Sequence, residues 1–325
     1  MKATAIAPAN VGLIKYWGRI DESLRIPENG SISVNLSSLT TTTTVEFHDS
    51  YEKDQVTIVE IEDVHAVGRV LEQIDRIRKR ANIKAKARVV SHNSFPTSTG
   101  LSSSSSGFAA LTLAASSAAG LELSEKELSI LARLGSGSAC RSIPDGFVEW
   151  TAGSSHESSY AYSVFPPDHW DIVDIVVVVS TTKKEVSSTQ GQKYARTSVF
   201  YPTRLSHIGQ KIREMKSYIE QKDFFAFGKT LEEEALELHA VMLTSKPPLL
   251  YFTSETITLL KRVLIWRSEG LPVFFTLNTG QDIHLFCEKK NQETLLANLK
   301  SEKEVQRIIV NNPAKGARLT NNHLF

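Results

Sequence analysis

The sequence predicts an α/β protein built from two domains. Its first half mixes strand and helix signals: a β-branched, alternating segment at 31–47 precedes helical apolar spacing at 64–80. The pattern changes near 180–200, where long helical segments begin to dominate. A chain of 325 residues, 41% of them hydrophobic, has ample length for two cores. We therefore expect domains at 1–185 and 186–325.

The elements of the first half follow from residue type and spacing. Ser124 is a good helix N-cap, and Glu127 three residues later completes a capping box. In chain order we expect strands at 3–8 and 31–47, a helix at 64–80, a strand at 85–90, and helices at 108–119 and 124–134.

The second half begins with a continuous apolar run at 172–179, which is typical of a strand buried on both faces. After it we expect helices at 203–220, 223–241 and 254–269, strands at 273–277 and 283–287, and a last helix at 292–299.

A serine run gives the first functional signal. Five serines, Ser102 to Ser106, follow a Pro and a Gly and directly precede an Ala-rich helical segment. Small residues let backbone N–H groups approach an anion, and a helix start adds unpaired N–H donors and partial positive charge. The segment predicts a phosphate cradle. It is not a Walker loop, because no Gly-Lys-Ser/Thr ends it. A flexible serine linker is the alternative.

Composition excludes several function classes. The net charge of +1 gives no support for nucleic-acid or membrane attraction, and a solvated helix face explains the charged stretch at 69–86. Cys140 and Cys287 make neither a disulfide framework nor a metal-ligand set, so a reducing cytosol is expected. The N-terminus lacks a signal-peptide core, and no apolar run is long enough to span a membrane.

Two further segments carry cations beside small or hydroxyl residues. In residues 8–19, Lys15, Tyr16 and Arg19 suit a phosphate-bearing ligand. In residues 135–150, a turn of small residues precedes Arg141, which can bind a carboxylate or phosphate through two hydrogen bonds. Cys140 has no nearby His to act as its base, so we interpret it as a packed residue rather than a nucleophile.

The chain resembles the mevalonate diphosphate decarboxylases and their relatives in the GHMP kinase superfamily. The matching segments run in the family's order over almost the whole chain; they lie at 14–18, 26–33, 96–107, 135–150, 186–188, around His239 with Pro247 and Pro248, and at 276–284. The resemblance implies a GHMP-kinase-like fold, with an N-terminal mixed sheet, a C-terminal ferredoxin-like α/β sandwich and an active site between them. It also implies that ATP and Mg²⁺ are used to phosphorylate the 3-hydroxyl of a phosphorylated mevalonate, which then loses phosphate and carbon dioxide in isoprenoid biosynthesis.

The resemblance also assigns roles to residues. Arg141 would hold the substrate carboxylate, Lys15, Tyr16 and Arg19 the 5-phosphate end, and Ser104 and Ser105 phosphate or Mg²⁺. The full candidate set comprises, as catalytic residues, Asn278, Arg141 and Lys15; for substrate, Tyr16, Arg19, Ser136, Gly137, Ser138, Arg141, Lys193 and Arg196; and for ATP, Pro96, Gly100, Ser102, Ser103, Ser104, Ser105 and Ser106. A homodimer is expected by resemblance alone.

One departure from the family concerns the base. Asn278 stands where the family has an Asp close to the 3-hydroxyl, and an amide cannot accept a proton as a carboxylate does. Three explanations remain open: a deliberate Asp→Asn change that traps substrate, a natural Asn helped by a neighbour such as Asp282, or a mevalonate 3-kinase-like relative that does not decarboxylate. We favour the first, because every other motif is intact, and expect Asn278→Asp to turn over much faster.

The second departure concerns the substrate. Arg19 replaces a common Lys, and residues 143–146 replace a more usual glycine-rich turn. Variants of this kind resemble enzymes that take 5-phosphomevalonate. Asp145 would disfavour a second phosphate by repulsion, unless it is an ordinary turn residue. We therefore expect 5-phosphomevalonate in preference to 5-diphosphomevalonate.

Overall fold

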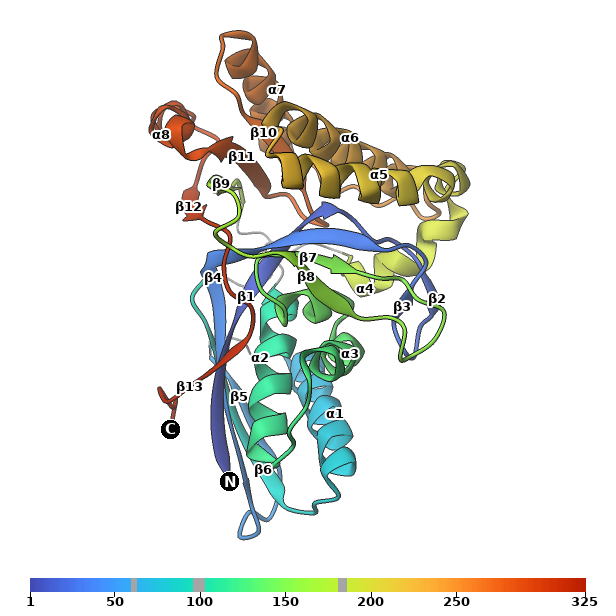
Figure 1. Cartoon of the computed structure of the whole chain (residues 1–325), viewed down its shortest axis with the longest axis vertical. Helices are drawn as coiled ribbons and strands as arrows, with labels where there is room; N and C mark the ends of the chain where they lie inside the picture. The colour runs from blue at the N-terminus through green and yellow to red at the C-terminus, as the bar shows by residue number, and fades with distance from the viewer. Residues whose placement is uncertain (60–62, 96–102, 181–185) are drawn as a thin grey trace.

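The structure is a computed structural model that describes residues 1–59, 63–95, 103–180 and 186–325 (Figure 1). It is a mixed α/β protein with two main sheets, as the sequence predicts. The strands are β1 Lys2–Ile14, β2 Arg19–Asp21, β3 Ile26–Pro27, β4 Ser31–His48, β5 Gln55–Ile58, β6 Lys86–Asn93, β7 Phe147–Trp150, β8 Ala161–Phe165, β9 Ile172–Val178, β10 Phe274–Leu277, β11 Ile283–Glu288, β12 Arg307–Asn311 and β13 Arg318–Thr320. The α-helices are α1 Val64–Ala81, α2 Ser103–Ala118, α3 Glu125–Gly135, α4 Ser188–Gly191, α5 Tyr201–Gln221, α6 Phe224–Leu243, α7 Ser254–Ser268 and α8 Gln292–Lys300, and the 3₁₀ helices are η1 Gly137–Ser142, η2 Gln192–Thr197 and η3 Lys289–Asn291.

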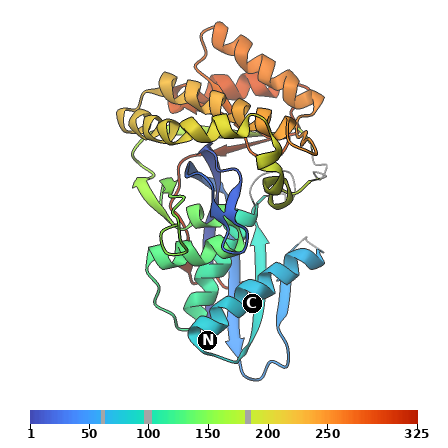
Figure 2. The ribbon, with the colours of Figure 1, turned by 90° about the vertical axis from the view of Figure 1, so that its right-hand side faces the viewer.

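The first layer is a seven-stranded sheet with helices α1, α2 and α3 against it (Figures 1 and 2). Its main path runs β13-β1-β4-β6-β5, with β7 paired to β4 and β8 to β7. Helix α2 packs closely on β1 and β4 because its inner face is mostly alanine, at Ala109, Ala110, Ala114 and Ala115. This close packing brings the start of α2 beside the end of β1.

The second layer is a four-stranded antiparallel sheet in the order β10-β11-β9-β12. Successive side chains of β9 point to opposite faces, which explains its unbroken apolar sequence. Val173, Ile175 and Val177 pack with α7 and α8, whereas Val176 and Val178 join a cluster with α5, α6 and strand β4. The second cluster is therefore the contact between the two layers.

The chain changes layers twice. Strand β9 precedes residue 185 yet belongs to the second sheet, and β13 returns near the C-terminus to pair with β1. We propose two domains whose change of sheet falls between β8 and β9, with the last strand returning to the first domain.

Helix α2 begins inside the serine run. The sequence analysis places the helix start at Phe108, whereas the first described helical residue is Ser103. Ser105 and Ser106 are buried, and the Oγ atom of Ser106 lies 2.6 Å from Oγ1 of Thr41 on β4. The small serine side chains let the first turn of the helix pack against the sheet.

Candidate active site

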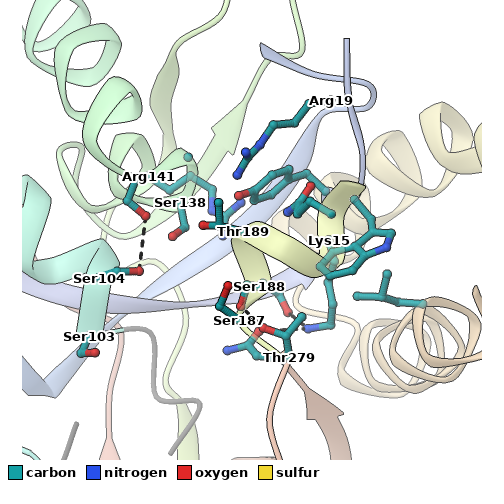
Figure 3. Close-up of a pocket in the computed structure, with 18 of the residues that line it drawn as sticks. Lys15, Arg19, Ser103, Ser104, Ser138, Arg141, Ser187, Ser188, Thr189 and Thr279 are labelled. Atoms are coloured by element: carbon teal, nitrogen blue, oxygen red, sulfur yellow. Dashed lines mark hydrogen bonds between the residues drawn. The ribbon is translucent and has the colours of Figure 1, made fainter. Parts of the chain in front are cut away.

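A cavity of about 240 Å³ lies where the two layers meet, and both halves of the chain line it (Figure 3). The first layer contributes the end of β1 and the starts of α2 and η1, and the second contributes α4, α6 and the loop after β10. The lining residues are Gly12, Lys15, Tyr16, Trp17, Arg19, Arg69, Ser103, Ser104, Ser136, Gly137, Ser138, Arg141, Ser187, Ser188, Thr189, Gln192, Leu238, Asn278 and Thr279.

The cavity is basic. Lys15, Arg19, Arg69 and Arg141 line it, and the lining residues that the structure describes include no Asp or Glu. Cations gathered in a concave, partly dry site attract anions strongly. The arrangement suits a ligand that carries several negative charges.

Arg141 is a buried cation, with 5% of its surface exposed. Its Nε and Nη2 atoms donate to Oδ1 of Asn10 at 3.2 and 3.0 Å, and Nη1 donates to Oγ of Ser31 at 2.9 Å. Burial lowers the pKa of Arg141, and it forms no ion pair with a described residue. A buried charge without a partner is unfavourable, so an anionic ligand group beside Arg141 would be stabilised.

Lys15 directly follows β1 and is also buried. Its Nζ atom donates to the carbonyl oxygen of Gly12 at 2.6 Å and lies 3.5 Å from Oδ1 of Asn278. Burial is the largest cause that lowers the pKa of Lys15; Glu234 opposes it and the charges of Arg141 and Arg204 add to it, and together they bring the pKa to about 7. The neutral amine is therefore accessible near pH 7.

Two helices of the second layer hold the backbone of Lys15. Its N–H donates to Oε1 of Glu234 on α6 at 2.9 Å, and Arg204 on α5 donates to its carbonyl oxygen at 2.8 Å. Arg204 and Glu234 form a buried, bidentate ion pair. These contacts fix the end of β1, and with it the position of the lysine side chain.

Tyr16 and Gly137 fit closely together in the wall. The Tyr16 ring packs edge-on against Trp150, with ring centroids 4.6 Å apart. A Cβ atom at Gly137 would lie 2.6 Å from the Tyr16 hydroxyl, so only glycine leaves that hydroxyl its present place.

Arg19 has a side chain that is 3% exposed and pairs with Glu22 at 2.8 Å. Its Nε atom has no hydrogen-bond partner among the described residues. A buried donor of this kind requires an acceptor, which a ligand phosphate would supply.

The start of α2 reaches the cavity through Ser103 and Ser104. The Oγ atom of Ser136 donates to Oγ of Ser104 at 3.3 Å, which joins the serine helix to the η1 turn (Figure 3). Ser105 and Ser106 are buried instead, because successive helix residues point in directions about 100° apart. Thus Ser104 of the proposed Mg²⁺ pair lines the cavity, and Ser105 does not.

A second cavity of about 260 Å³ adjoins the first. It shares Arg69, Ser103 and Ser104 with the first cavity. Elsewhere its wall is largely apolar, with Ile58, Val70, Val89, Phe108 and Leu111. A ligand with an apolar part and an anionic part can occupy both cavities across the start of α2.

Two buried histidines lie in the second layer and bond to protein groups. His239 donates to the carbonyl oxygen of Asn278 at 3.2 Å and stacks on Phe252, and burial with the charge of Lys15 lowers its pKa to about 3. His284 lies 3.0 Å from Asp174 within the second sheet. Within the described ranges, no three His, Cys, Asp or Glu side chains gather as metal ligands.

Most candidates from the sequence meet in the cavity. Lys15, Tyr16, Arg19, Ser103, Ser104, Ser136, Gly137, Ser138, Arg141 and Asn278 all line it. Lys193 is exposed and Arg196 pairs with Glu28 at 3.1 Å, so neither belongs to the lining. Pro96, Gly100 and Ser102 lie outside the described residues.

Two acids and one thiol that lie near candidate residues in the sequence are not among the lining residues of the cavity. Asp145 accepts a hydrogen bond from the N–H of Gly316 at 2.6 Å and is not among the lining residues, which favours the ordinary turn residue over a repulsive role. Asp282 is buried, accepts from the N–H of Val179 and is not among the lining residues of the cavity. Cys140 is fully buried and burial raises the pKa of its thiol to about 12, which confirms a packed residue.

Arg69 is the main residue that the sequence analysis missed. Its helix was interpreted as a solvated face, but Arg69 lines both cavities and lies over the Phe108 ring, 4.6 Å from the centroid. It also donates to the carbonyl oxygen of Gly135 at 2.9 Å. Nothing in the spacing of this helix separates Arg69 from its solvated neighbours. Ser187, Ser188, Thr189, Gln192 and Thr279 are the other polar lining residues outside the candidate set.

Known proteins are similar to this chain over most of its length. The family model "Diphosphomevalonate decarboxylase-like N-terminal domain" matches residues 7–161, and "Mevalonate 5-diphosphate decarboxylase C-terminal domain" matches 174–321. The diphosphomevalonate decarboxylase of Candida albicans is 35% identical over 91% of this chain and 86% of its own length. That of Saccharomyces cerevisiae is 34% identical over 91% and 80%.

Solved structures of decarboxylases are similar to this chain in both fold and sequence. The mevalonate diphosphate decarboxylase of Staphylococcus aureus has a TM-score of 0.93 and 38% identity, over 98% of each chain. A structure described as MDDEF in complex with MVAPP, AMPPCP and magnesium has a TM-score of 0.92 and 35% identity, over 98% of this chain and 99% of its own. The chain belongs to the diphosphomevalonate decarboxylase family, whose members are ATP-dependent carboxy-lyases.

Proposed function

We propose that this chain decarboxylates a phosphorylated mevalonate after phosphorylating its 3-hydroxyl with ATP. The observation that carries the proposal is Arg141, a buried cation without an acidic partner in a cavity lined by three more basic residues. The chemistry needs such a site, because the substrate carries a carboxylate at one end and phosphate at the other. The names of the relatives support the same reaction.

The basic residues divide between the two ends of the substrate. We place the carboxylate at Arg141 and the 5-phosphate end at Tyr16 and Arg19, whose Nε donor is free to bond it. Holding both ends fixes the 3-hydroxyl between them, near Lys15 and Asn278. The same cations stabilise the charge that develops when the 3-phosphate and carbon dioxide leave.

The nucleotide would occupy the second cavity and the start of α2. The adenosine part fits the apolar wall at Phe108 and Leu111, and the phosphates would cross Ser103 and Ser104 into the basic cavity. The hydroxyl of Ser104 fits the hard oxygen ligands that Mg²⁺ prefers, and Mg²⁺ usually keeps several waters and phosphate oxygens besides one or two protein ligands. When bound with ATP, Mg²⁺ offsets the phosphate charge.

We propose 5-diphosphomevalonate as the substrate. The argument for 5-phosphomevalonate rested on Arg19, on the turn at 143–146 and on the charge of Asp145, which is bonded to Gly316 and is not among the lining residues of the cavity. The relatives are named for the diphosphate. The assay with 5-diphosphomevalonate and 5-phosphomevalonate measures how many phosphates the site at Arg19 and Tyr16 prefers.

The test supplies the purified chain with ATP, Mg²⁺ and either 5-diphosphomevalonate or 5-phosphomevalonate, and follows ADP and carbon dioxide. We expect both products, with the larger kcat/KM for the diphosphate. A larger value for the monophosphate would overturn the substrate assignment. Formation of ADP without carbon dioxide would identify a kinase instead.

We further propose a cytosolic homodimer, on the basis of the family resemblance and the two unpaired cysteines. Light scattering coupled to gel filtration would test the dimer. None of the helices in the described ranges is both long enough and apolar enough to cross a membrane.

A further inference from the structure

We propose that Lys15, as the neutral amine, accepts the proton of the substrate hydroxyl, so that Asn278 only orients that hydroxyl. The inference rests on the proposed function and assigns the base within that site. It concerns this chain because an amide stands at position 278, where the family that the chain resembles has an Asp, and an amide cannot accept a proton as a carboxylate does.

The geometry places an acceptor and an orienting amide side by side. Nζ of Lys15 and Oδ1 of Asn278 are 3.5 Å apart, and both residues line the basic cavity. In Figure 3, Lys15 and Thr279, the neighbour of Asn278, extend into the same part of the cavity. A hydroxyl that bonds the Asn278 amide therefore lies within reach of the lysine nitrogen.

The other titratable groups of the cavity are poorly suited to accept the proton. His239 uses Nε2 to donate to the Asn278 carbonyl oxygen, and its low pKa makes it a weak base. Asp282 is buried outside the cavity lining. Arginines do not deprotonate in proteins, and the proposed function places Tyr16, the other titratable lining residue, at the 5-phosphate end. That leaves Lys15 among the described lining residues.

The charges that face Lys15 favour its neutral form. Arg141 on η1 and Arg204 on α5 repel the ammonium, whereas Glu234 on α6 and Asp174 on β9 attract it. Each carboxylate already has a partner, because Glu234 pairs with Arg204 and Asp174 with His284. Burial is the largest effect and lowers the pKa of Lys15 to about 7. An aspartate at 278 would add an unshared negative charge beside Nζ and would favour the ammonium.

The step balances in atoms and charge. As the 3-oxygen forms its bond to the γ-phosphorus of ATP, the bond from that phosphorus to the β–γ bridging oxygen breaks and ADP leaves. The hydroxyl proton moves to Nζ, so Lys15 ends as an ammonium beside the new 3-phosphate. That charge then stabilises the phosphate as a leaving group, and the proton returns to solvent after product release.

The test compares the pH dependence of kcat/KM for the unaltered chain and for Asn278→Asp, with the same ATP and substrate. Substrate phosphates titrate identically in both reactions, so a difference between the profiles reports the enzyme. For the unaltered chain we expect activity to fall tenfold per pH unit below about 7. In Asn278→Asp the carboxylate becomes the base, and the fall moves toward the ordinary carboxyl range near pH 4. The variant is then about tenfold faster at pH 6 and equal at pH 8.

Two lysine variants complete the test. Lys15→Arg keeps a cation at this position, but the arginine cannot lose its proton. As a single substitution it should lower kcat at least about 100-fold, and in the Asn278→Asp background it should lower kcat much less. Lys261→Met removes a cation from the exposed part of α7 and should leave the profile unchanged.

The outcomes distinguish a wrong assignment of Lys15 from a wrong proposed function. Identical pH profiles for the unaltered chain and Asn278→Asp, or full activity in Lys15→Arg, would overturn the assignment of Lys15 while leaving the decarboxylase intact. Failure to form ADP and carbon dioxide from either phosphorylated mevalonate, in any variant, would overturn the proposed function itself. If Lys15→Arg does not fold, the comparison with Asn278→Asp still decides.

Discussion

The Nζ atom of Lys15 lies 3.5 Å from the Oδ1 atom of Asn278, across the contact between the two layers. Lys15 directly follows strand β1 of the first sheet, whereas Asn278 directly follows β10 of the second. The pair therefore forms only when the layers are packed together, so the proposed base and its orienting amide come from different layers.

Arg141→Gln should weaken substrate capture. The substitution removes the cation that we place at the carboxylate, and loss of one partner from a buried charge pair costs about 2–5 kcal/mol. We expect kcat/KM to fall by about 30-fold or more. Steady-state kinetics measure kcat/KM, and thermal unfolding of the same variant measures its stability.

The same variant should unfold at the same temperature as the unaltered chain, or a higher one, when no substrate is present. Arg141 has no acidic partner among the described residues, so its removal relieves a buried charge. An unchanged kcat/KM would contradict the role of Arg141.

Gly137→Ala should disturb Tyr16 and raise KM. The new Cβ atom would lie 2.6 Å from the Tyr16 hydroxyl, which must then move. Tyr16→Phe removes that hydroxyl, so the double variant should have a lower KM than additivity predicts.

Gly68→Ala is the matched control. Nothing lies within 4 Å of a Cβ atom at Gly68 in helix α1, so alanine there should leave KM unchanged and add about 1 kcal/mol of stability or less. Strict additivity of Gly137→Ala and Tyr16→Phe would show that the two residues act independently.

Arg69→Gln should weaken nucleotide binding, because Arg69 lines both cavities. One charge-assisted contact contributes about 1.5–3 kcal/mol, so we expect the Kd for ATP to rise about tenfold or more. Isothermal titration calorimetry with Mg²⁺ and a non-hydrolysable ATP analogue measures the change. Lys79→Gln removes an exposed charge from the same helix and should not change the Kd.

Glu234→Gln should destabilise the protein. It leaves Arg204 buried and poorly paired, and breaking such a pair costs about 3–5 kcal/mol. Glu302→Gln, at the half-exposed pair with Arg262, should cost less than about 1 kcal/mol. Urea unfolding of both variants makes the comparison.

The same Glu234→Gln variant bears on the pH profile. Removal of the carboxylate that raises the pKa of Lys15 should lower that pKa, so the acid limb of kcat/KM should shift to lower pH. An acid limb that stays in place would show that Glu234 does not act on the titrating group.

Regular elements with strong periodicity were predictable from the sequence. The capping box at Ser124 and Glu127 is present, and the apolar run at 172–179 is a strand buried on both faces. Short strands such as β5, β12 and β13 were missed, because three to five residues with mixed polarity carry little periodic signal. Pairing with distant strands stabilises them.

The site residues that belong to sequence motifs were predictable from the sequence. Lys15, Arg141 and Asn278 are assembled as expected, although they lie far apart in the sequence. Arg69 was missed because its helical face resembles a solvated one, and the hydrogen bond that holds Asp145 comes from Gly316, a residue distant in sequence. Such errors arise from contacts that no local pattern encodes.

The central claim is best tested by measuring ADP and carbon dioxide in one reaction of the unaltered chain at pH 8, with ATP, Mg²⁺ and carboxyl-labelled 5-diphosphomevalonate. The account predicts one carbon dioxide for each ADP, at a rate that Arg141→Gln reduces. Labelled carboxylate that stays in the substrate while ADP accumulates would contradict it.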